Sequence, residues 1–180
     1  MIIKVRENLE LRTRCVEEAE EIFAVIDKNR AYLQKYLMWI DSTKSPEDVK
    51  KSIEDCRKEF EDKSGIILGI YLDNKYVGNM GLHNLKSYGN NSGEIGYWLA
   101  EDYQGQGIVT DCVRAFIDYA FNELNLNRIY IECAFSNKKS RAVPERLGFV
   151  QEGVYQDGIC LYGTYQDVVI YGMVKRNWKT

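Results

Sequence analysis

Apolar residues recur with helical periodicity in the second half of the chain. Between residues 108 and 124 the apolar positions are 108, 109, 112, 113, 116, 117, 120, 121 and 124, with polar side chains between them. Because an α-helix repeats every 3.6 residues, this spacing predicts an amphipathic helix over 108–124 that buries one face. A shorter stretch of the same kind predicts a helix over 16–28.

Two further helices are indicated by their ends. Ser45 is followed by Pro46 and two acidic residues, a combination that caps a helix and favours its first turn, so we expect a helix from 45 to about 62. Residues 137–147 precede Gly148, and glycine commonly ends helices. Pro144 lies inside this fourth helix and lacks a backbone N–H. We therefore expect that helix to be kinked or irregular.

Runs of β-branched and aromatic residues bounded by turn residues predict the strands. The expected strands are 8–14, 65–72, 75–84, 92–99, 128–135 and a pair within 149–178 that turns near Gly163. Asp73 and Asn74 fit a tight hairpin, and a loop at 87–91 precedes the strand at 92–99. The order is mixed α and β, with a strand–loop–helix–strand unit at its centre.

Composition adds limits on the class of protein. The chain has 180 residues, 45% of them hydrophobic, and no repeat or linker, so we predict a single domain over 1–180. The net charge of −3 argues against a nucleic-acid partner. The N-terminus lacks the apolar core of a signal peptide, and the longest apolar stretch, 66–72, is too short to span a membrane. We expect a cytoplasmic protein with no membrane partner.

Metal chemistry is not indicated. The chain holds five cysteines and one histidine, His83. The cysteines are scattered and include no Cys-x-x-Cys pair, which is typical of buried thiols in a reducing compartment. A single histidine leaves no multi-histidine site. We therefore expect no bound metal.

The candidate chemistry lies where the strand at 92–99 leads into the helix at 108–124. Gly105 and Gly107 let the backbone approach a ligand closely, and a helix N-terminus offers free N–H groups and partial positive charge. A pyrophosphate held by main-chain donors fits this loop; a glycine turn of purely steric origin is the alternative. A P-loop is excluded because no Gly-Lys-Ser/Thr run exists, and a dinucleotide fingerprint because Thr110 replaces its third glycine.

At this loop the sequence resembles a known family. The acyl-CoA loop of the GNAT acetyltransferase superfamily, Gln/Arg-x-x-Gly-x-Gly/Ala, is similar to Gln104-Gly105-Gln106-Gly107-Ile108-Val109. Residues 137–149 resemble the second cofactor element of that superfamily. The chain also resembles the branch of this superfamily that acetylates ribosomal-protein N-termini. The similar positions of this chain are residues 94–99, 29–30, Trp39, Gly153 and Asp167. Two departures are Val109, where Gly or Ala is usual, and Pro144.

The resemblance implies the GNAT α/β fold, a twisted mixed sheet of about seven strands that is splayed at its centre to admit CoA, with helices on both sides. It also implies acetyl-CoA as the acyl donor, with a binding site formed by Gln104, Gly105, Gln106, Gly107, Ile108, Val109, Thr110, Asn137 and Ser140. In this assignment the amides of 108–110 and the Gln104 side chain face the pyrophosphate. Asn137 contacts the pantetheine arm, or acts only as a helix cap.

Acetyl transfer to an amine requires a base, because the amine is mostly protonated at neutral pH. Glu94 stands where members of the superfamily place a catalytic carboxylate; His83 or a water chain is the alternative. Many of these enzymes protonate the departing thiolate with a tyrosine at the position that Pro144 occupies here. Ser140 is then the candidate hydroxyl, with a capping role as its alternative. Without a suitably placed Cys–base pair, we expect direct transfer in a ternary complex.

The acceptor is less constrained. Tyr32, Tyr36 and Trp39 lie in the region that forms the acceptor side of the cleft in this fold, with core packing as the alternative. The resemblance favours a protein N-terminal amine, of a ribosomal protein above all, although polyamines, amino acids and aminoglycosides use the same fold. A non-catalytic acyl-CoA-binding sensor would keep residues 104–110 without needing Glu94 or Ser140. The sequence leaves open whether the chain forms a homo-oligomer.

Overall fold

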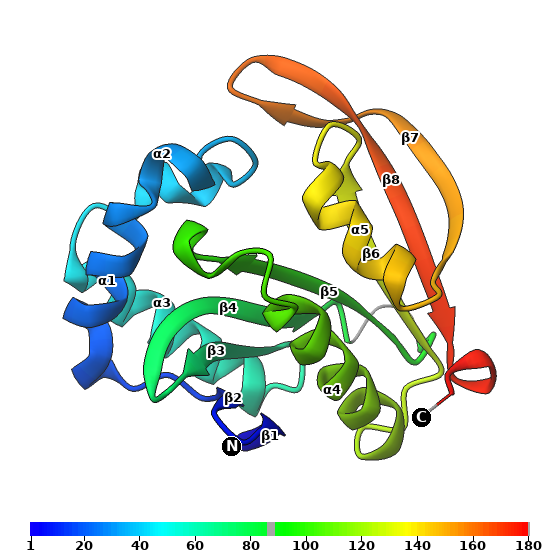
Figure 1. Ribbon diagram of the computed structural model, residues 1–180, viewed down its shortest axis with the longest axis horizontal. Helices are drawn as coiled ribbons and strands as arrows, with labels where there is room; N and C mark the ends of the chain where they lie inside the picture. Colours follow the sequence, from blue (N-terminus) through cyan, green and yellow to red (C-terminus); the bar gives the residue numbers. More distant parts are fainter. Residues whose placement is uncertain (86–88, 180) are drawn as a thin grey trace.

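The computed structural model describes residues 1–85 and 89–179 (Figure 1). Its strands form one sheet in the order β1-β2-β3-β4-β5-β6-β8-β7, in which β5 and β6 are parallel and the other neighbours antiparallel. The strands are β1 Ile2–Arg6, β2 Leu9–Arg12, β3 Ile66–Leu72, β4 Lys75–His83, β5 Ser92–Leu99, β6 Arg128–Ala134, β7 Val150–Leu161 and β8 Thr164–Val174.

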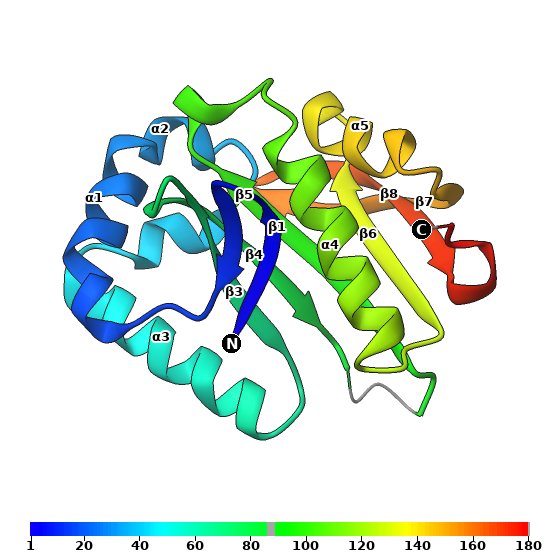
Figure 2. The same cartoon turned by 60° about the horizontal axis from the view of Figure 1, so that its bottom comes forward.

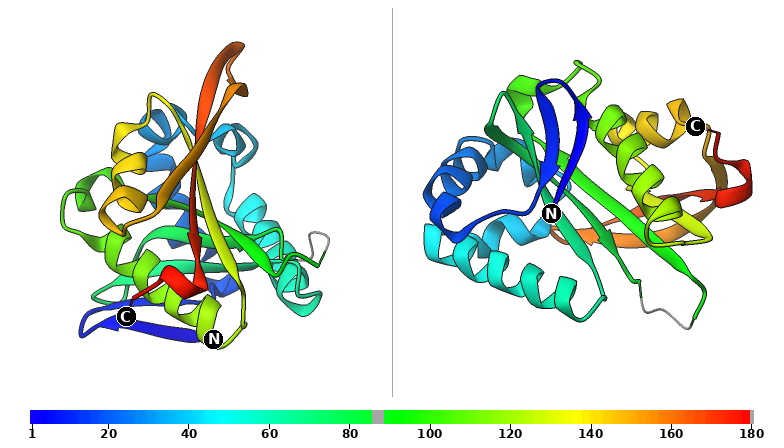
Figure 3. Two further views of the ribbon diagram at one scale, coloured as in Figure 1. Left: turned by 90° about the vertical axis from the view of Figure 1, so that its right-hand side faces the viewer. Right: turned by 90° about the horizontal axis from the view of Figure 1, so that it is seen from below.

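The expected strands are present, with one addition. The strand predicted at 8–14 is the shorter β2, and it pairs with β1, which the sequence pattern did not indicate. β1 is an edge strand of five residues that are all exposed or half-buried, and its apolar stretch is too short, and too mixed with charged residues, for the pattern to indicate it. Of the loop predicted at 87–91, residues 87 and 88 lie outside the described part of the chain. The hairpin of β7 and β8 extends beyond the rest of the sheet (Figure 3).

Helices cover both faces of the sheet, as expected. They are α1 Ala19–Lys28, α2 Arg30–Leu33, α3 Pro46–Glu61, α4 Ile108–Asn122 and α5 Lys138–Arg146. The N-terminal part of the helix predicted at 16–28 is a separate 3-10 turn, Val16–Glu18. The Ser45 cap is confirmed, because its hydroxyl accepts from the amide of Asp48 while the Asp48 carboxylate accepts from Ser45. No helix in the described residues is long and apolar enough to cross a membrane.

Two groups of buried side chains hold these layers together. The larger group lies between the sheet and α4, which crosses the sheet in Figure 2, and includes Ile95, Phe116 and Val143. The smaller group lies on the opposite face between the sheet, α1 and α3, and includes Tyr76 and Trp98. Because side chains alternate along β5, Ile95 faces α4 while Trp98 faces α1 and α3.

The sheet is opened between its two parallel strands. β5 and β6 pair over only three residues each, from Ser92 with Arg128 to Glu94 with Tyr130. Beyond Glu94, β5 continues to Leu99 and keeps its pairing with β4, while β6 continues to Ala134 along β8. The two halves of the sheet therefore diverge toward the ends of β5 and β6 (Figure 1). The splay expected at the centre of the sheet is present.

Candidate active site

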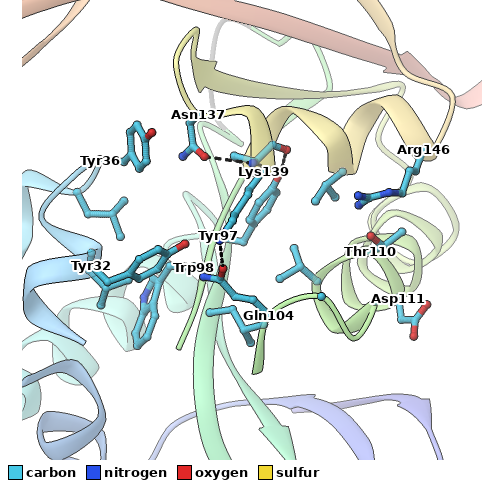
Figure 4. A pocket seen from close by; sticks show the side chains of 18 residues that line it. Tyr32, Tyr36, Tyr97, Trp98, Gln104, Thr110, Asp111, Asn137, Lys139 and Arg146 are labelled. Atoms are coloured by element: carbon cyan, nitrogen blue, oxygen red, sulfur yellow. Dashed lines mark hydrogen bonds between the residues drawn. The ribbon is translucent and has the colours of Figure 1, made fainter. Parts of the chain in front are cut away.

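A cavity of about 770 Å³ occupies the opening between β5 and α5 (Figure 4). Its walls come from the end of β5, the loop before α4, the first turn of α4, α5 and the segment around α2. The lining residues are Tyr32, Leu33, Tyr36, Leu37, Tyr97, Trp98, Leu99, Gln104, Gly105, Gly107, Val109, Thr110, Asp111, Asn137, Lys139, Ser140, Val143 and Arg146. The two sequence elements assigned to the cofactor thus face one space.

The loop before α4 presents main-chain donors to this cavity. Gly105 and Gly107 both have φ of +75°, a conformation that favours glycine, and Gly107 is the N-cap of α4. The amide of Asp111 donates to the carbonyl of Gly107. The amides of 108–110 lie before this first helical hydrogen bond and have no acceptor within the helix. They are therefore free to bind an anion.

Most of the predicted cofactor residues line the cavity, but Gln106 and Ile108 do not. Lys139 of α5 donates to Oε1 of Gln104 at 2.8 Å, linking α5 to the loop (Figure 4). The Gln106 side chain turns away and donates to the carbonyl of Asp102 at 3.4 Å. The Ile108 side chain is 1% exposed in the core. Any contact that Ile108 makes with a ligand is through its amide.

The first turn of α5 contains the remaining cofactor candidates. The Asn137 side chain accepts from the amide of Ser140 at 3.2 Å, so the capping role is present, and Asn137 also lines the cavity. The Ser140 hydroxyl lies 3.2 Å from Sγ of Cys133 and 3.3 Å from the Tyr97 hydroxyl. Burial raises the pKa of Cys133, which keeps it a neutral thiol.

Pro144 removes the amide that would bond to the carbonyl of Ser140, four residues earlier. Tyr97 of β5 takes its place, donating from its hydroxyl to that carbonyl at 2.8 Å. α5 is continuous from Lys138 to Arg146 with Pro144 inside it. At Pro144 the helix lacks one hydrogen bond that proline cannot donate, and a side chain from the sheet supplies another donor.

Tyr97 is a site residue that the sequence analysis missed. Its hydroxyl contacts both the carbonyl and the hydroxyl of Ser140, and its ring lines the cavity. Burial raises the pKa of Tyr97 well above its usual value, so the hydroxyl keeps its proton and can donate. Pro144 signals an unpaired carbonyl at Ser140 in the sequence. The sequence does not show which donor reaches this carbonyl, because that depends on the splay of the sheet and on the register of β5.

The two candidate bases are neighbours on the face of the sheet opposite α4. The register of β4 and β5 places His83 beside Glu94. Glu94 accepts from Nδ2 of Asn84 at 2.9 Å, and Asn84 also contacts the Tyr130 hydroxyl at 3.1 Å. Glu94 is the last residue of β5 that pairs with β6, at the closed end of the splay, and it does not line the 770 Å³ cavity.

Burial brings both bases toward neutrality. It raises the pKa of Glu94 more than the hydrogen bonds from Asn84 and Tyr130 lower it. It lowers the pKa of His83, against a smaller opposing effect of the Glu59 charge. For each group, burial destabilises the charged form by more than the neighbouring groups stabilise it. The shift moves the pKa of Glu94 toward the pH range in which a general base works. It moves the pKa of His83 further below that range, which leaves the imidazole neutral and able to accept a proton.

A second cavity of about 340 Å³ lies on the face of the sheet that carries α1 and α3. Leu37, Tyr97 and Trp98 line both cavities and form their junction. The predicted acceptor residues divide between them. Tyr32 and Tyr36 line the first cavity, whereas Trp39 lines the second, with its ring centroid 6.0 Å from that of Trp98. His83 also lines the second cavity.

No cluster of three or more His, Cys, Asp or Glu side chains suited to a metal ion occurs in residues 1–85 and 89–179. The donors at the opening are instead main-chain amides, neutral hydroxyls and the cations Lys139 and Arg146. This set suits a phosphate-bearing ligand, because amides at a helix N-terminus and cations both stabilise negative charge.

Comparison with known proteins agrees with this geometry. A family model described as an acetyltransferase (GNAT) domain matches residues 8–150. The putative ribosomal N-acetyltransferase YdaF of Bacillus subtilis is 40% identical over 177 residues, which cover 98% of this chain and 96% of that protein.

Two solved structures have the same fold. RimL, a ribosomal L7/L12 alpha-N-protein acetyltransferase in complex with coenzyme A, superposes with a TM-score of 0.92 at 29% identity, covering 97% of this chain and 98% of its own. The microcin C7 self immunity acetyltransferase MccE, in complex with acetyl-CoA and AMP, gives a TM-score of 0.90 at 30% identity, covering 95% and 94%.

The pairing of Tyr97 with Pro144 predicts non-additive stabilities. Tyr97→Phe leaves the Ser140 carbonyl without its donor and should lower the free energy of unfolding by about 1–3 kcal/mol. In a Pro144→Ala background the amide of residue 144 can bond to that carbonyl, so the same change should cost clearly less. Urea unfolding of the four proteins in this double-mutant cycle measures the difference. Equal losses in both backgrounds would show that Tyr97 does not replace the missing amide.

Proposed function

The chain belongs to the acetyltransferase (GNAT) family, and we propose that it transfers an acetyl group from acetyl-CoA to the N-terminal amine of a protein, of the ribosomal-protein type, by direct attack in a ternary complex. The family makes it an N-acetyltransferase. The acceptor class follows the names of YdaF and RimL, which cover nearly the whole chain. A ribosomal-protein acceptor is also consistent with the cytoplasmic location expected for the enzyme.

The single observation that carries the proposal is the junction of the two cavities at Tyr97 and Trp98. The first cavity contains the cofactor elements, and the second lies on the other face of the sheet and shares Leu37, Tyr97 and Trp98 with the first. An acyl donor in one cavity and an amine in the other would meet at these shared residues. Cys133, the thiol next to Ser140, is 4% exposed and its pKa is raised by burial. A buried neutral thiol is a poor nucleophile, which favours direct transfer.

The residues of the first cavity fit CoA. The amides of 108–110 and the side chain of Lys139 would hold its phosphates, and Asn137 would meet the pantetheine arm. When bound, acetyl-CoA supplies a thioester that is reactive toward amines. The role of the protein is to orient acetyl-CoA and to exclude water. Val109, Val143 and Leu99 provide apolar walls for this.

Two proton movements remain for the chain to handle. The amine must lose a proton, and Glu94 or His83 lies on the acceptor face to take it, directly or through water. The departing thiolate must be stabilised, and the Ser140 hydroxyl lies in the cofactor cavity, held by Tyr97. Because a hydroxyl has a pKa far above that of a thiol, Ser140 acts as a hydrogen-bond donor more than as a full proton donor.

The direct test is release of free CoA from acetyl-CoA over a panel of amines. N-terminal peptides should be acetylated with higher kcat/KM than spermidine, free amino acids or an aminoglycoside. Preference for one of these small amines would identify a small-molecule acetyltransferase instead. Binding without turnover of any amine would identify an acyl-CoA sensor. CoA should also raise the melting temperature, because a ligand that binds only the folded state stabilises it, by about 2.7 kcal/mol at 100 times its Kd.

A variant pair ties that shift to the assigned loop. Gly107→Asp should abolish it, because a carboxylate at the N-cap of α4 repels phosphate and fills its approach. The control is Gly163→Asp in the β7–β8 turn, where φ is +78° and the backbone strain is matched. Gly163→Asp should lower the melting temperature but keep the shift. A normal shift in Gly107→Asp would refute the loop assignment.

Glu94→Gln should lower kcat by about 10²- to 10⁴-fold, the usual contribution of general base catalysis, with little change in acetyl-CoA affinity. The loss should shrink at high pH, where the α-amino group, with a pKa of about 8, is already deprotonated. The raised pKa of Glu94 should move the acid limb of the wild-type pH–rate profile above the usual range of a glutamate, because the base works only when deprotonated. If His83→Ala loses this activity and Glu94→Gln keeps it, His83 is the base.

Ser140→Ala, assayed at saturating acetyl-CoA, should reduce kcat several-fold and leave the Kd for CoA nearly unchanged, because the hydroxyl acts on charge that develops only during transfer. Ser136→Ala is the matched control, since the Ser136 hydroxyl pairs with Oε1 of Gln166 and does not line the cavity. Wild-type kcat in Ser140→Ala would leave water as the proton source.

A further inference from the structure

The second cavity contains polar atoms that the protein itself leaves unpaired. Ile26, Leu37, Trp39, Val49 and Trp98 form its apolar walls. Arg14, Ser52, Cys56, Tyr76 and Asn79 supply its polar groups, while His83, Gly81 and Gly96 line the part of β4 and β5 next to the junction with the cofactor cavity. This arrangement of apolar walls with a few convergent polar groups is typical of a ligand site.

Two of these polar groups are buried without a partner. The Tyr76 hydroxyl and Oδ1 of Asn79 make no hydrogen bond within residues 1–85 and 89–179. Tyr76 is 2% exposed, and burial raises the pKa of its hydroxyl, which therefore stays a neutral donor. An unpaired buried polar atom costs about 1–3 kcal/mol, and folded proteins contain few of them. Two in one cavity indicate that something else completes their hydrogen bonds.

Arg14 adds an uncompensated positive charge to the same cavity. Its guanidinium donates to Sγ of Cys56 at 3.0 Å, and a thiol is only a weak acceptor. No carboxylate of the described residues lies within 4.0 Å of it, whereas the nearby Arg12 pairs with Glu10 and Glu18. The Arg14 guanidinium lies beside the Tyr76 hydroxyl and opposes part of the effect of burial on the Tyr76 pKa, but the geometry of the two groups falls short of a hydrogen bond. Most donors of the fork thus remain available.

These groups together define the chemistry of a ligand. An arginine fork binds a carboxylate through paired hydrogen bonds, and a neutral tyrosine hydroxyl donates to the same kind of oxygen. The Asn79 oxygen accepts from an N–H group. We propose that this cavity is a subsite for a carboxylate carried by the acceptor close to its reacting amine, bound by Arg14 and Tyr76. The inference rests on the proposed function only in taking the acceptor to be an amine.

The position of the cavity sets how close the carboxylate must be. Tyr97 and Trp98 line both this cavity and the cofactor cavity, so the proposal requires a carboxylate that is only a few bonds from an amine held at this junction. Two sources of carboxylate satisfy this spacing: the side chain of an N-terminal Asp or Glu in a protein, and the α-carboxylate of a free amino acid. The charge of Arg14 disfavours a cationic acceptor such as a polyamine.

The test compares kcat/KM for peptides that differ only in their first residue. An N-terminal Asp should be acetylated about 10- to 100-fold faster than Asn, the range expected from a charged hydrogen bond. Arg14→Gln should bring this ratio within about twofold of one, and Arg14→Lys should retain part of it. Arg57→Gln removes the same charge from an exposed residue paired with Glu61 outside the cavity, and should leave the ratio unchanged.

Free serine and serinamide distinguish the two sources. If serine exceeds serinamide while Asp and Asn peptides are equal, the α-carboxylate is the ligand; this outcome supports the subsite and refutes the protein acceptor. Asp-to-Asn and serine-to-serinamide ratios near one, or ratios that survive Arg14→Gln, would overturn the subsite even if peptides are good substrates.

A binding measurement covers the case in which no amine is turned over. With CoA present, a peptide bearing N-acetyl-aspartate at its start should raise the melting temperature of the wild type more than its N-acetyl-asparagine counterpart. This difference should vanish in Arg14→Gln and persist in Arg57→Gln. No difference in the wild type would overturn the proposal.

Discussion

The β5–β6 ladder ends after Glu94 and Tyr130, and the site exists because both strands continue beyond that point. Each strand keeps an antiparallel partner on its other edge, β4 for β5 and β8 for β6, so each half of the sheet stays ordered while they separate. The cost is a row of main-chain groups that the opposite strand no longer pairs. Tyr97 and Trp98 lie beside this space and line the cavities on both faces of the sheet.

The groups around the two cavities differ in charge. The hydroxyls of Tyr97 and Ser140 are neutral, and burial shifts the pKa values of Glu94 and His83 toward the neutral form of each side chain. Cations lie at the margins of each cavity. In surroundings with little water, a hydrogen-bond donor interacts more strongly with a charge that develops during a reaction. Neutral donors therefore stabilise that charge without binding the uncharged reactants too tightly before it forms.

The sequence predicted the parts whose local pattern is complete in itself. α4 has a clean apolar stripe, and Gly105 and Gly107 need a conformation that few other residues adopt, so the loop and helix were found with nearly correct bounds. β1 was missed because it is a five-residue edge strand in which only Ile3 and Val5 turn toward the core, too short a pattern to stand out in the sequence. Tyr97 was missed because its role depends on a carbonyl 43 residues away. The separation of Trp39 from Tyr32 and Tyr36 depends on where the sheet opens, which no local pattern contains.

The bond between Tyr97 and the Ser140 carbonyl also constrains how such a sequence can have arisen. With a residue other than proline at 144, the amide of α5 serves the carbonyl and the hydroxyl of Tyr97 is a redundant second donor. Tyrosine at 97 can therefore precede proline at 144 in a lineage without loss. In the reverse order the intermediate carries an orphaned carbonyl beside the reacting groups. The order in which the two residues are introduced therefore matters: with tyrosine at 97 first the Ser140 carbonyl keeps a donor throughout, and with proline at 144 first it does not.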